Sequence, residues 1–175
     1  LPRHGITTTF VDPSDAENFK TAVQENTRTF FIESLGNPKL DVLDIEAISK
    51  QAQSSKVPLI VDNTVATPCL LNPIEHGANI VIHSLTKYIN GNGTALGGAI
   101  IDAGTFDWTN GKFPEFTEPS PGYHGLVYSE ALEAAAFIAK IRIEGLRDYG
   151  AALSPFNAFQ IIQGLETLEV RIQKH

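Results

Sequence analysis

The amino-acid sequence predicts an α/β fold with a mostly parallel sheet flanked by helices. Two short runs, 57–62 and 78–85, are apolar on both faces, which is typical of parallel strands covered by helices on both sides. Segments with helical spacing of apolar residues alternate with such runs, and this alternation is the pattern of a parallel α/β layer. The 175 residues match the length of one ordinary domain.

The first part of the chain alternates short strands and helices. A β-branched and aromatic run at 5–11 predicts a strand, and a short helix ending near residue 23 follows it. The run 29–34 predicts a buried strand, which the breaker Gly-Asn-Pro at 36–38 ends. Apolar residues at helical spacing predict a helix over 41–54, whose first turns carry acidic side chains that suit the helix dipole.

Beyond the strand at 57–62, glycine and proline separate the remaining elements. Residues 73–77 predict a helical turn before the strand at 78–85, and a glycine-rich turn at 91–98 leads into a further strand. Residues 105–125 lack periodicity and mix aromatic residues with prolines, so they predict a long loop. That loop is either a surface excursion or part of a channel or lid over a site.

Two helices are predicted toward the end of the chain. The alanine-rich segment 128–147 predicts the first, and 154–173 predicts a second long helix. The second helix carries an apolar stripe that must pack against something. If the chain alone lacks that partner, we expect self-association. The stripe consists of Phe156, Phe159, Ile162, Leu165 and Ile172.

The composition excludes several classes of protein. The 13 Lys and Arg residues against 20 Asp and Glu residues give a net charge of −7, so no nucleic-acid partner is expected. No apolar run approaches the ~20 residues of a membrane span. The single cysteine, Cys69, excludes an internal disulfide, and we expect it to be buried as a small hydrophobe. The histidines are scattered, so no metal site is predicted.

Two features of the chain ends shape the domain prediction. The chain begins Leu-Pro-Arg and contains no methionine, so we expect it to be an internal piece of a longer protein. It shows no charged segment followed by an apolar stretch, as a signal peptide would, and we therefore expect a cytoplasmic location.

Polar and ionisable side chains lie at the ends of the two apolar strands. Asp62 closes the first, and His83-Ser84-Leu85-Thr86-Lys87 spans the end of the second. The spacing between Asp62 and Lys87 fits one crossover between parallel strands. Because ligands bind beyond the carboxyl ends of such strands, we expect these side chains to meet at one edge. We expect His83 itself to be a packed or hydrogen-bonded residue.

This set of groups suits one cofactor chemistry. A lysine amine is a nucleophile toward an aldehyde, and an acid beside a protonated pyridine nitrogen strengthens that ring as an electron sink. The hydroxyls of Ser84 and Thr86 can donate to a phosphate. Together they are the protein's side of a pyridoxal phosphate site. Taken alone, a lysine is more often a solvated surface residue and Asp62 a helix cap or a structural ion pair, but Lys87 is less ordinary because it follows an apolar strand.

Longer motifs carry a family resemblance. VDNTVATP at 61–68 and HSLTKY at 83–88 resemble the signature of the cysteine and methionine metabolism family of pyridoxal phosphate enzymes. ESLGNP at 33–38, NPIEHGANIVIHSLTKY at 72–88 and the segment 105–125 most resemble its O-acetylhomoserine sulfhydrylase branch. GLETLEVRIQKH at 164–175 resembles the family segment after the long helices, so the resemblance covers essentially the whole chain.

The resemblance implies the fold, the cofactor and the site residues. It implies that residues 1–175 are the central part of the large domain of fold-type I pyridoxal phosphate enzymes. The N-terminal segment and the C-terminal domain of the family, with its substrate-binding arginine, match nothing in this chain. The family's lysine that binds pyridoxal 5'-phosphate covalently matches Lys87, and the acid at the pyridine nitrogen matches Asp62. The other cofactor-binding positions match Ser84 and Thr86 at the phosphate, Asn37 near the 3-oxygen, and Thr64 near the ring.

The resemblance also implies a reaction. In this branch, O-acetylhomoserine and sulfide give homocysteine and acetate, a γ-replacement on a small amino-acid substrate, and the family assembles as a homotetramer. Cystathionine γ-synthase and the γ-lyases share the same core residues and remain alternatives. A catalytically silent α/β fragment or an interaction module is the alternative from another class of protein.

Overall fold

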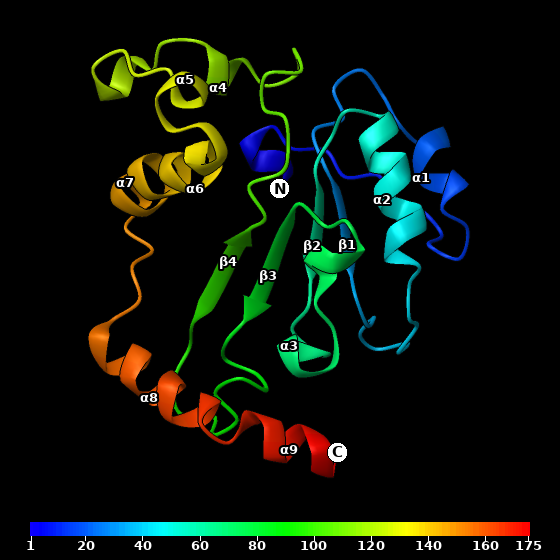
Figure 1. Cartoon of the computed structure of the whole chain (residues 1–175), viewed down its shortest axis with the longest axis vertical. Coiled ribbons are helices and arrows are strands. Elements are labelled where there is room, and N and C mark those ends of the chain that lie inside the picture. Colours follow the sequence, from blue (N-terminus) through cyan, green and yellow to red (C-terminus); the bar gives the residue numbers. More distant parts are fainter.

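A computed structural model describes residues 1–175 and contains a sheet of four strands in the order β1-β2-β3-β4. Strands β1, β2 and β3 run parallel, and β4 runs antiparallel to β3. The predicted α/β class with a mostly parallel sheet is therefore confirmed (Figure 1). The strands are β1 (Phe30–Glu33), β2 (Leu59–Asp62), β3 (Ile80–Ser84) and β4 (Gly98–Asp102).

The register aligns the carboxyl ends of the three parallel strands. Glu33 of β1 pairs with Asp62 of β2, and Asp62 pairs with Ile82 of β3. Helix α2 (Ile45–Ser54) connects β1 to β2, and helix α3 (Thr67–Leu70) lies in the connection from β2 to β3. Residues 85–97 join β3 to β4 without a helix that would cross the sheet, and β4 pairs antiparallel with β3.

The largest core cluster lies between α2 and one face of the sheet. Ile45, Ile48 and Ala52 of α2 are buried, and they belong to the same cluster as Val61 and Val81 of the sheet. Helix α1 (Glu17–Thr21) contributes Phe19 to this cluster. The arrangement follows from the 3.6-residue spacing of the apolar positions.

Two predicted boundaries in this half of the chain are wrong. Helix α2 begins at Ile45 rather than at 41, because the Asp44 carboxylate caps it by accepting from the Ala47 amide at 2.9 Å. The predicted strand at 5–11 does not form. No strand lies beside this segment to pair with it, and its Phe10 is 94% exposed.

A second core cluster occupies the other face of the sheet and corrects the prediction for 105–125. Trp108, Phe113 and Phe116 of this segment are buried together with Ile80 and Tyr128. The segment follows β4, whose end pairs with the start of β3, so it lies at the opposite end of the strands from α3 (Figure 1). These aromatic residues are therefore part of the core while most of the segment's other residues are exposed, and it does not lie over the carboxyl edge. Its one-turn helix is α4 (Pro114–Thr117).

The predicted helix over 128–147 is broken into short pieces. Glu133 has a left-handed backbone conformation, with φ at 44°, and this conformation interrupts the helical hydrogen-bond pattern. A π-helical turn at Ile141–Leu146 then widens the helix, as such turns do within α-helices. The pieces are α5 (Tyr128–Leu132), α6 (Ala136–Lys140) and α7 (Arg147–Tyr149).

The last predicted helix, 154–173, forms as two helices, α8 (Pro155–Leu165) and α9 (Leu168–Lys174). Ser154 caps α8 by accepting from the Asn157 amide at 3.1 Å. The predicted apolar stripe of α8 is solvent-exposed, with Phe156 at 67% and Phe159 at 57% exposure. The opposite face contributes Ile161 to a third buried cluster with Leu168 and Ile89.

No helix of the structure is long and apolar enough to cross a membrane. The remaining turns are 3₁₀ helices. They span Pro2–His4, Pro73–His76, Pro121–Tyr123 and Glu133–Ala135.

Candidate active site

Hydrogen bonds join the ends of β2 and β3. The Thr64 hydroxyl donates to Oδ1 of Asp62 at 2.5 Å, and the Thr64 amide donates to the same oxygen at 2.9 Å. The Thr64 hydroxyl also accepts from the Ser84 amide at 2.8 Å. Asp62, Thr64 and Ser84 therefore meet at the carboxyl edge, as the strand order predicts.

The turn after β3 brings Lys87 to this edge through its backbone. The Lys87 amide donates to the Ser84 carbonyl at 3.1 Å, which links the lysine to the Asp62–Thr64–Ser84 chain. The Lys87 residue is exposed, and its Nζ makes no hydrogen bond or ion pair within the chain. Lys87 borders an open groove of about 350 Å³, together with Tyr88, Arg171 and His175. Asp62 does not line this groove.

Thr86 and Asn37 make separate contacts. The Thr86 hydroxyl donates to the Gly97 carbonyl at 3.3 Å and accepts from the Gly97 amide at 3.1 Å, so it closes the turn before β4. Asn37 lies on the exposed loop after β1, where its amide donates to the Glu33 carboxylate at 2.8 Å. No hydrogen bond joins either residue to Asp62 or Lys87.

Asn63 is a buried residue beside this edge whose structural role the sequence predictions missed. It is fully buried, accepts from the Ser34 hydroxyl at 2.7 Å, and donates to the Leu71 carbonyl at 2.8 Å. Its side chain ties the end of β1 to the segment after α3, and so it holds the strand ends beside Asp62. An amide directly after a buried strand was the available signal, because a buried polar group needs partners.

His83 and Cys69 complete the neighbourhood of these strand ends. His83 is buried as predicted, and its Nδ1 has no hydrogen-bond partner. Burial lowers the pKa of His83, and the charge of Asp62 partly opposes that shift. Cys69 is exposed at the end of α3, which corrects the prediction that it would be a buried hydrophobe.

The groups left free at this edge fit pyridoxal phosphate. Only Oδ1 of Asp62 is held by Thr64, so Oδ2 can accept from a protonated ring nitrogen. The Ser84 hydroxyl makes no hydrogen bond within the chain and can donate to phosphate. The amine of Lys87 is free to react with an aldehyde. The Thr86 hydroxyl must release Gly97 before it can donate to phosphate.

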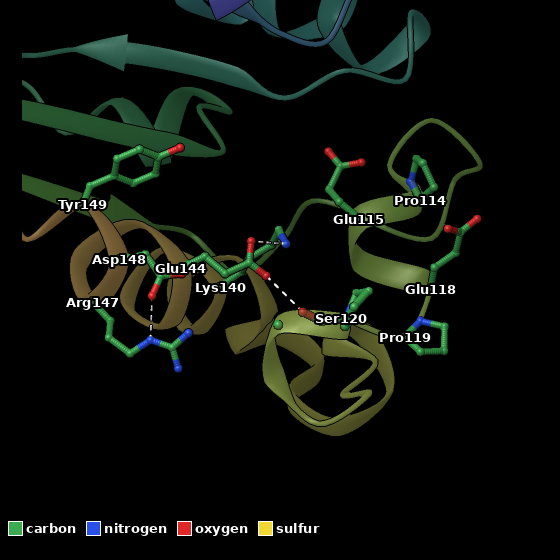
Figure 2. A pocket seen from close by; sticks show the side chains of 12 residues that line it. Pro114, Glu115, Glu118, Pro119, Ser120, Lys140, Glu144, Arg147, Asp148 and Tyr149 are labelled. Carbon is green, nitrogen blue, oxygen red and sulfur yellow. Dashed lines mark hydrogen bonds and ion pairs between the residues drawn. The ribbon is translucent and has the colours of Figure 1, made fainter.

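A second hollow, of about 480 Å³, lies between α4 and α7 and is built differently (Figure 2). Glu144 accepts there from Lys140 at 2.7 Å, Tyr128 at 3.0 Å and Ser120 at 3.3 Å. Burial raises the pKa of Glu144, but these hydrogen bonds outweigh it and hold the pKa below its ordinary value. Glu144 is therefore held by three partners, whereas the side chains of Glu115, Glu118 and Tyr149 line the hollow without a hydrogen bond within the chain.

Comparison with known proteins identifies the class that this fold and edge define. The chain belongs to the family of PLP-dependent enzymes of Cys/Met metabolism, and the sequence model of that family matches residues 1–175. It is 55% identical to O-acetyl-L-homoserine sulfhydrylase of Leptospira meyeri, and 50% identical to that of Corynebacterium glutamicum, over 100% of this chain in both cases. The chain spans 41% of the length of each of these two relatives.

Solved structures agree with these relatives. A Campylobacter jejuni protein described as an O-acetylhomoserine (thiol)-lyase superimposes with a TM-score of 0.90 and 44% identity, over 94% of this chain and 41% of that one. That structure contains a pyridoxyl-lysine monophosphate residue. The O-acetylhomoserine sulfhydrylase of Wolinella succinogenes superimposes with a TM-score of 0.83 and 36% identity, over 97% of this chain and 46% of that one.

Proposed function

We propose that the chain forms the central, cofactor-binding part of the large domain of an O-acetylhomoserine sulfhydrylase. In the proposed reaction, sulfide forms a bond to the γ-carbon of O-acetylhomoserine and acetate leaves, which gives homocysteine. The observation that carries the proposal is the hydrogen-bonded chain from Asp62 through Thr64 and Ser84 to the turn of Lys87. It supports the proposal because it connects the Asp62 carboxylate, whose Oδ2 is free, to the turn that carries Lys87.

Each residue of the edge has one task in this proposal. When bound, pyridoxal phosphate supplies an electron-withdrawing ring. Lys87 Nζ holds the cofactor and later takes and returns protons at substrate carbon atoms. Asp62 Oδ2 accepts from the ring nitrogen and keeps it protonated. Thr64 holds Asp62 Oδ1, so that the carboxylate keeps one orientation.

The remaining cofactor contacts are assigned by the same proposal. Ser84 donates its free hydroxyl to the phosphate, and Thr86 does so once its hydroxyl turns away from Gly97. Asn37 lies near the 3-oxygen, on the loop that follows β1. A homotetrameric assembly and a cytoplasmic location stay predictions of the family resemblance.

The experiment measures homocysteine formation from O-acetylhomoserine and sulfide, using the complete natural reading frame that contains this chain. Cysteine and O-succinylhomoserine serve as competing substrates, which separates the sulfhydrylase from cystathionine γ-synthase. We expect Lys87→Ala to lower kcat by about 10²–10⁴-fold, and Asp62→Asn by about 10²-fold. Lys50→Gln, a substitution of an exposed lysine on α2, is the matched control. Faster turnover of O-succinylhomoserine with cysteine, or homocysteine formation unaffected by Lys87→Ala, would reject the proposal.

A further inference from the structure

Arg171 on α9 directs its guanidinium at backbone carbonyls rather than at an acid. Nη1 donates to the Tyr88 carbonyl at 2.7 Å, and Nη2 donates to the carbonyls of Ile89 at 3.3 Å and Gly164 at 2.8 Å. Nε donates to the Thr167 hydroxyl at 3.1 Å. No carboxylate pairs with this half-buried cation. An arginine uses a rigid fork of donors, and here that fork joins α8 and α9 to the turn after β3.

The carbonyls of Tyr88 and Ile89 belong to the residues that directly follow Lys87. Within the Lys87 turn, residues 85–91, the Asn90 amide donates to the Leu85 carbonyl and the Gly91 amide donates to the Lys87 carbonyl. The carbonyls of Tyr88 and Ile89 accept from Arg171 alone. Arg171 is therefore the side chain that holds the two carbonyls just beyond the lysine, while the Asn90 side chain donates to the Ala95 carbonyl further along.

Glycines allow this close approach. A Cβ on Gly91 would lie 2.6 Å from Cζ of Arg171, and a Cβ on Gly164 would overlap the Asn90 backbone. Ile161, Ile89 and Leu168 form a buried cluster beneath the contact. Helix α9 also touches α3, which follows the Asp62 strand (Figure 1). The α8–α9 pair thus borders both strand-end loops of the candidate site.

We propose that Arg171 is a positioning residue, which sets the place of the Lys87 amine by fixing the carbonyls of Tyr88 and Ile89. The inference rests on the proposed function, because positioning matters only if Lys87 holds the cofactor. It extends that function to a residue 84 positions along the chain, on a helix that makes no contact with substrate in the proposed chemistry. A displacement of about 1 Å at a reacting group can cost on the order of 10²-fold in rate.

The test compares variants of the complete natural reading frame by covalent labelling. Each protein is mixed with pyridoxal phosphate and reduced with borohydride, and the adducts are mapped by mass spectrometry. The readout is the initial rate of labelling at Lys87 divided by that at exposed Lys39 and Lys50. General loosening of the fold could also lower this ratio, so Ile48→Val, which destabilises a distant core, serves as the stability control.

A matched pair of glycines isolates the guanidinium contact. Gly91 and Gly93 both have left-handed backbones, with φ at 70° and 65°. A Cβ on Gly91 meets Arg171, whereas a Cβ on Gly93 meets nothing within 4 Å. Gly93→Ala therefore carries the backbone strain of Gly91→Ala without displacing Arg171.

We expect Arg171→Ala and Gly91→Ala each to lower the labelling ratio by about tenfold to a hundredfold. Gly93→Ala and Ile48→Val should keep the wild-type ratio. Arg171→Lys should recover part of the ratio, because an ammonium reaches fewer carbonyls than the planar fork does. Combining Gly91→Ala with Arg171→Ala should add little, since both remove the same contact.

Two failures are distinguishable. If the wild-type protein shows no preference for Lys87, the proposed function fails. If it prefers Lys87 and Arg171→Ala labels at the same ratio, the positioning role of Arg171 is overturned and the proposed function stands. A ratio that falls equally in Gly93→Ala and Gly91→Ala also overturns the inference, because strain in the turn then explains the loss.

Discussion

Gly164 is the position at which one methyl group should separate α8 from the Lys87 turn. A Cβ there would overlap the Asn90 carbonyl oxygen and would lie 2.5 Å from the carbonyl carbon and 2.7 Å from Cα of that residue. These atoms are backbone, so they cannot move aside as a flexible side chain would. Gly164→Ala must therefore push α8 away from the turn, and with it the buried cluster around Ile161.

The loss of stability caused by Gly164→Ala follows from this close packing. Overpacking a well-filled core costs typically about 1–3 kcal/mol, and an obstacle made of backbone puts Gly164→Ala at the upper end, at about 3 kcal/mol. For a domain of this size, each kcal/mol lowers Tm by about 2–4 °C. We therefore expect Tm to fall by about 6–12 °C.

Circular dichroism during heating measures this shift, with Gly145→Ala as the control. Gly145 lies in the π-helical turn, and a Cβ there would make only an ordinary contact, 3.7 Å from Ile141. Alanine should be neutral or stabilising at that position by up to about 1 kcal/mol. A Tm for Gly164→Ala within about one degree of wild type would refute the close packing of α8 on the turn.

Three further predictions address the rest of the structure. Asn63→Ala should lower the free energy of unfolding by about 2–4 kcal/mol in urea titrations, because it leaves the Ser34 hydroxyl and the Leu71 carbonyl without their partner; an unchanged midpoint would contradict this. His83 has a folded-state pKa below the ordinary 6.5, so the unfolded chain binds the extra proton first and stability should fall as pH drops from about 7.5 to 5.5. His83→Gln should show a smaller fall over the same range, and parallel curves would contradict the assignment. The 175-residue chain by itself should self-associate through the exposed stripe of α8, and Phe156→Ser with Phe159→Ser should shift it toward monomer in sedimentation; a clean wild-type monomer would contradict this.

The sequence predicted the sheet best where the local apolar pattern of a strand matches its burial in the folded chain. The runs containing β2 and β3 are apolar on both faces, and a parallel sheet between helices is the arrangement that buries both. Asp62 and Ser84 close those strands, so their meeting at one edge followed from strand order alone. Asp44 illustrates a limit, because Asp41 and Asp44 are both N-cap residue types near the start of α2.

Other features depend on contacts between distant segments. Trp108 looks like a loop residue by its neighbours in sequence, yet it stacks on Phe116 and Phe137 at centroid distances of 4.3 and 5.1 Å. Nothing in local periodicity predicts that partnership. Arg171 lies on an amphipathic helix, where an arginine is unremarkable, and its role emerges only when α9 docks against the turn after Lys87. At the break between α8 and α9, the Thr167 hydroxyl accepts from Nε of the same arginine.

Whether Lys87 binds the cofactor is tested most directly in the protein without substitutions, by locating the reduced pyridoxal phosphate adduct. One equivalent of cofactor is added, borohydride is applied, and the peptides are sequenced by mass spectrometry. We expect the modified lysine to fall in the peptide HSLTKYINGNGTALGG, on Lys87. An adduct spread over lysines such as Lys39 and Lys50, with no excess on Lys87, would contradict it.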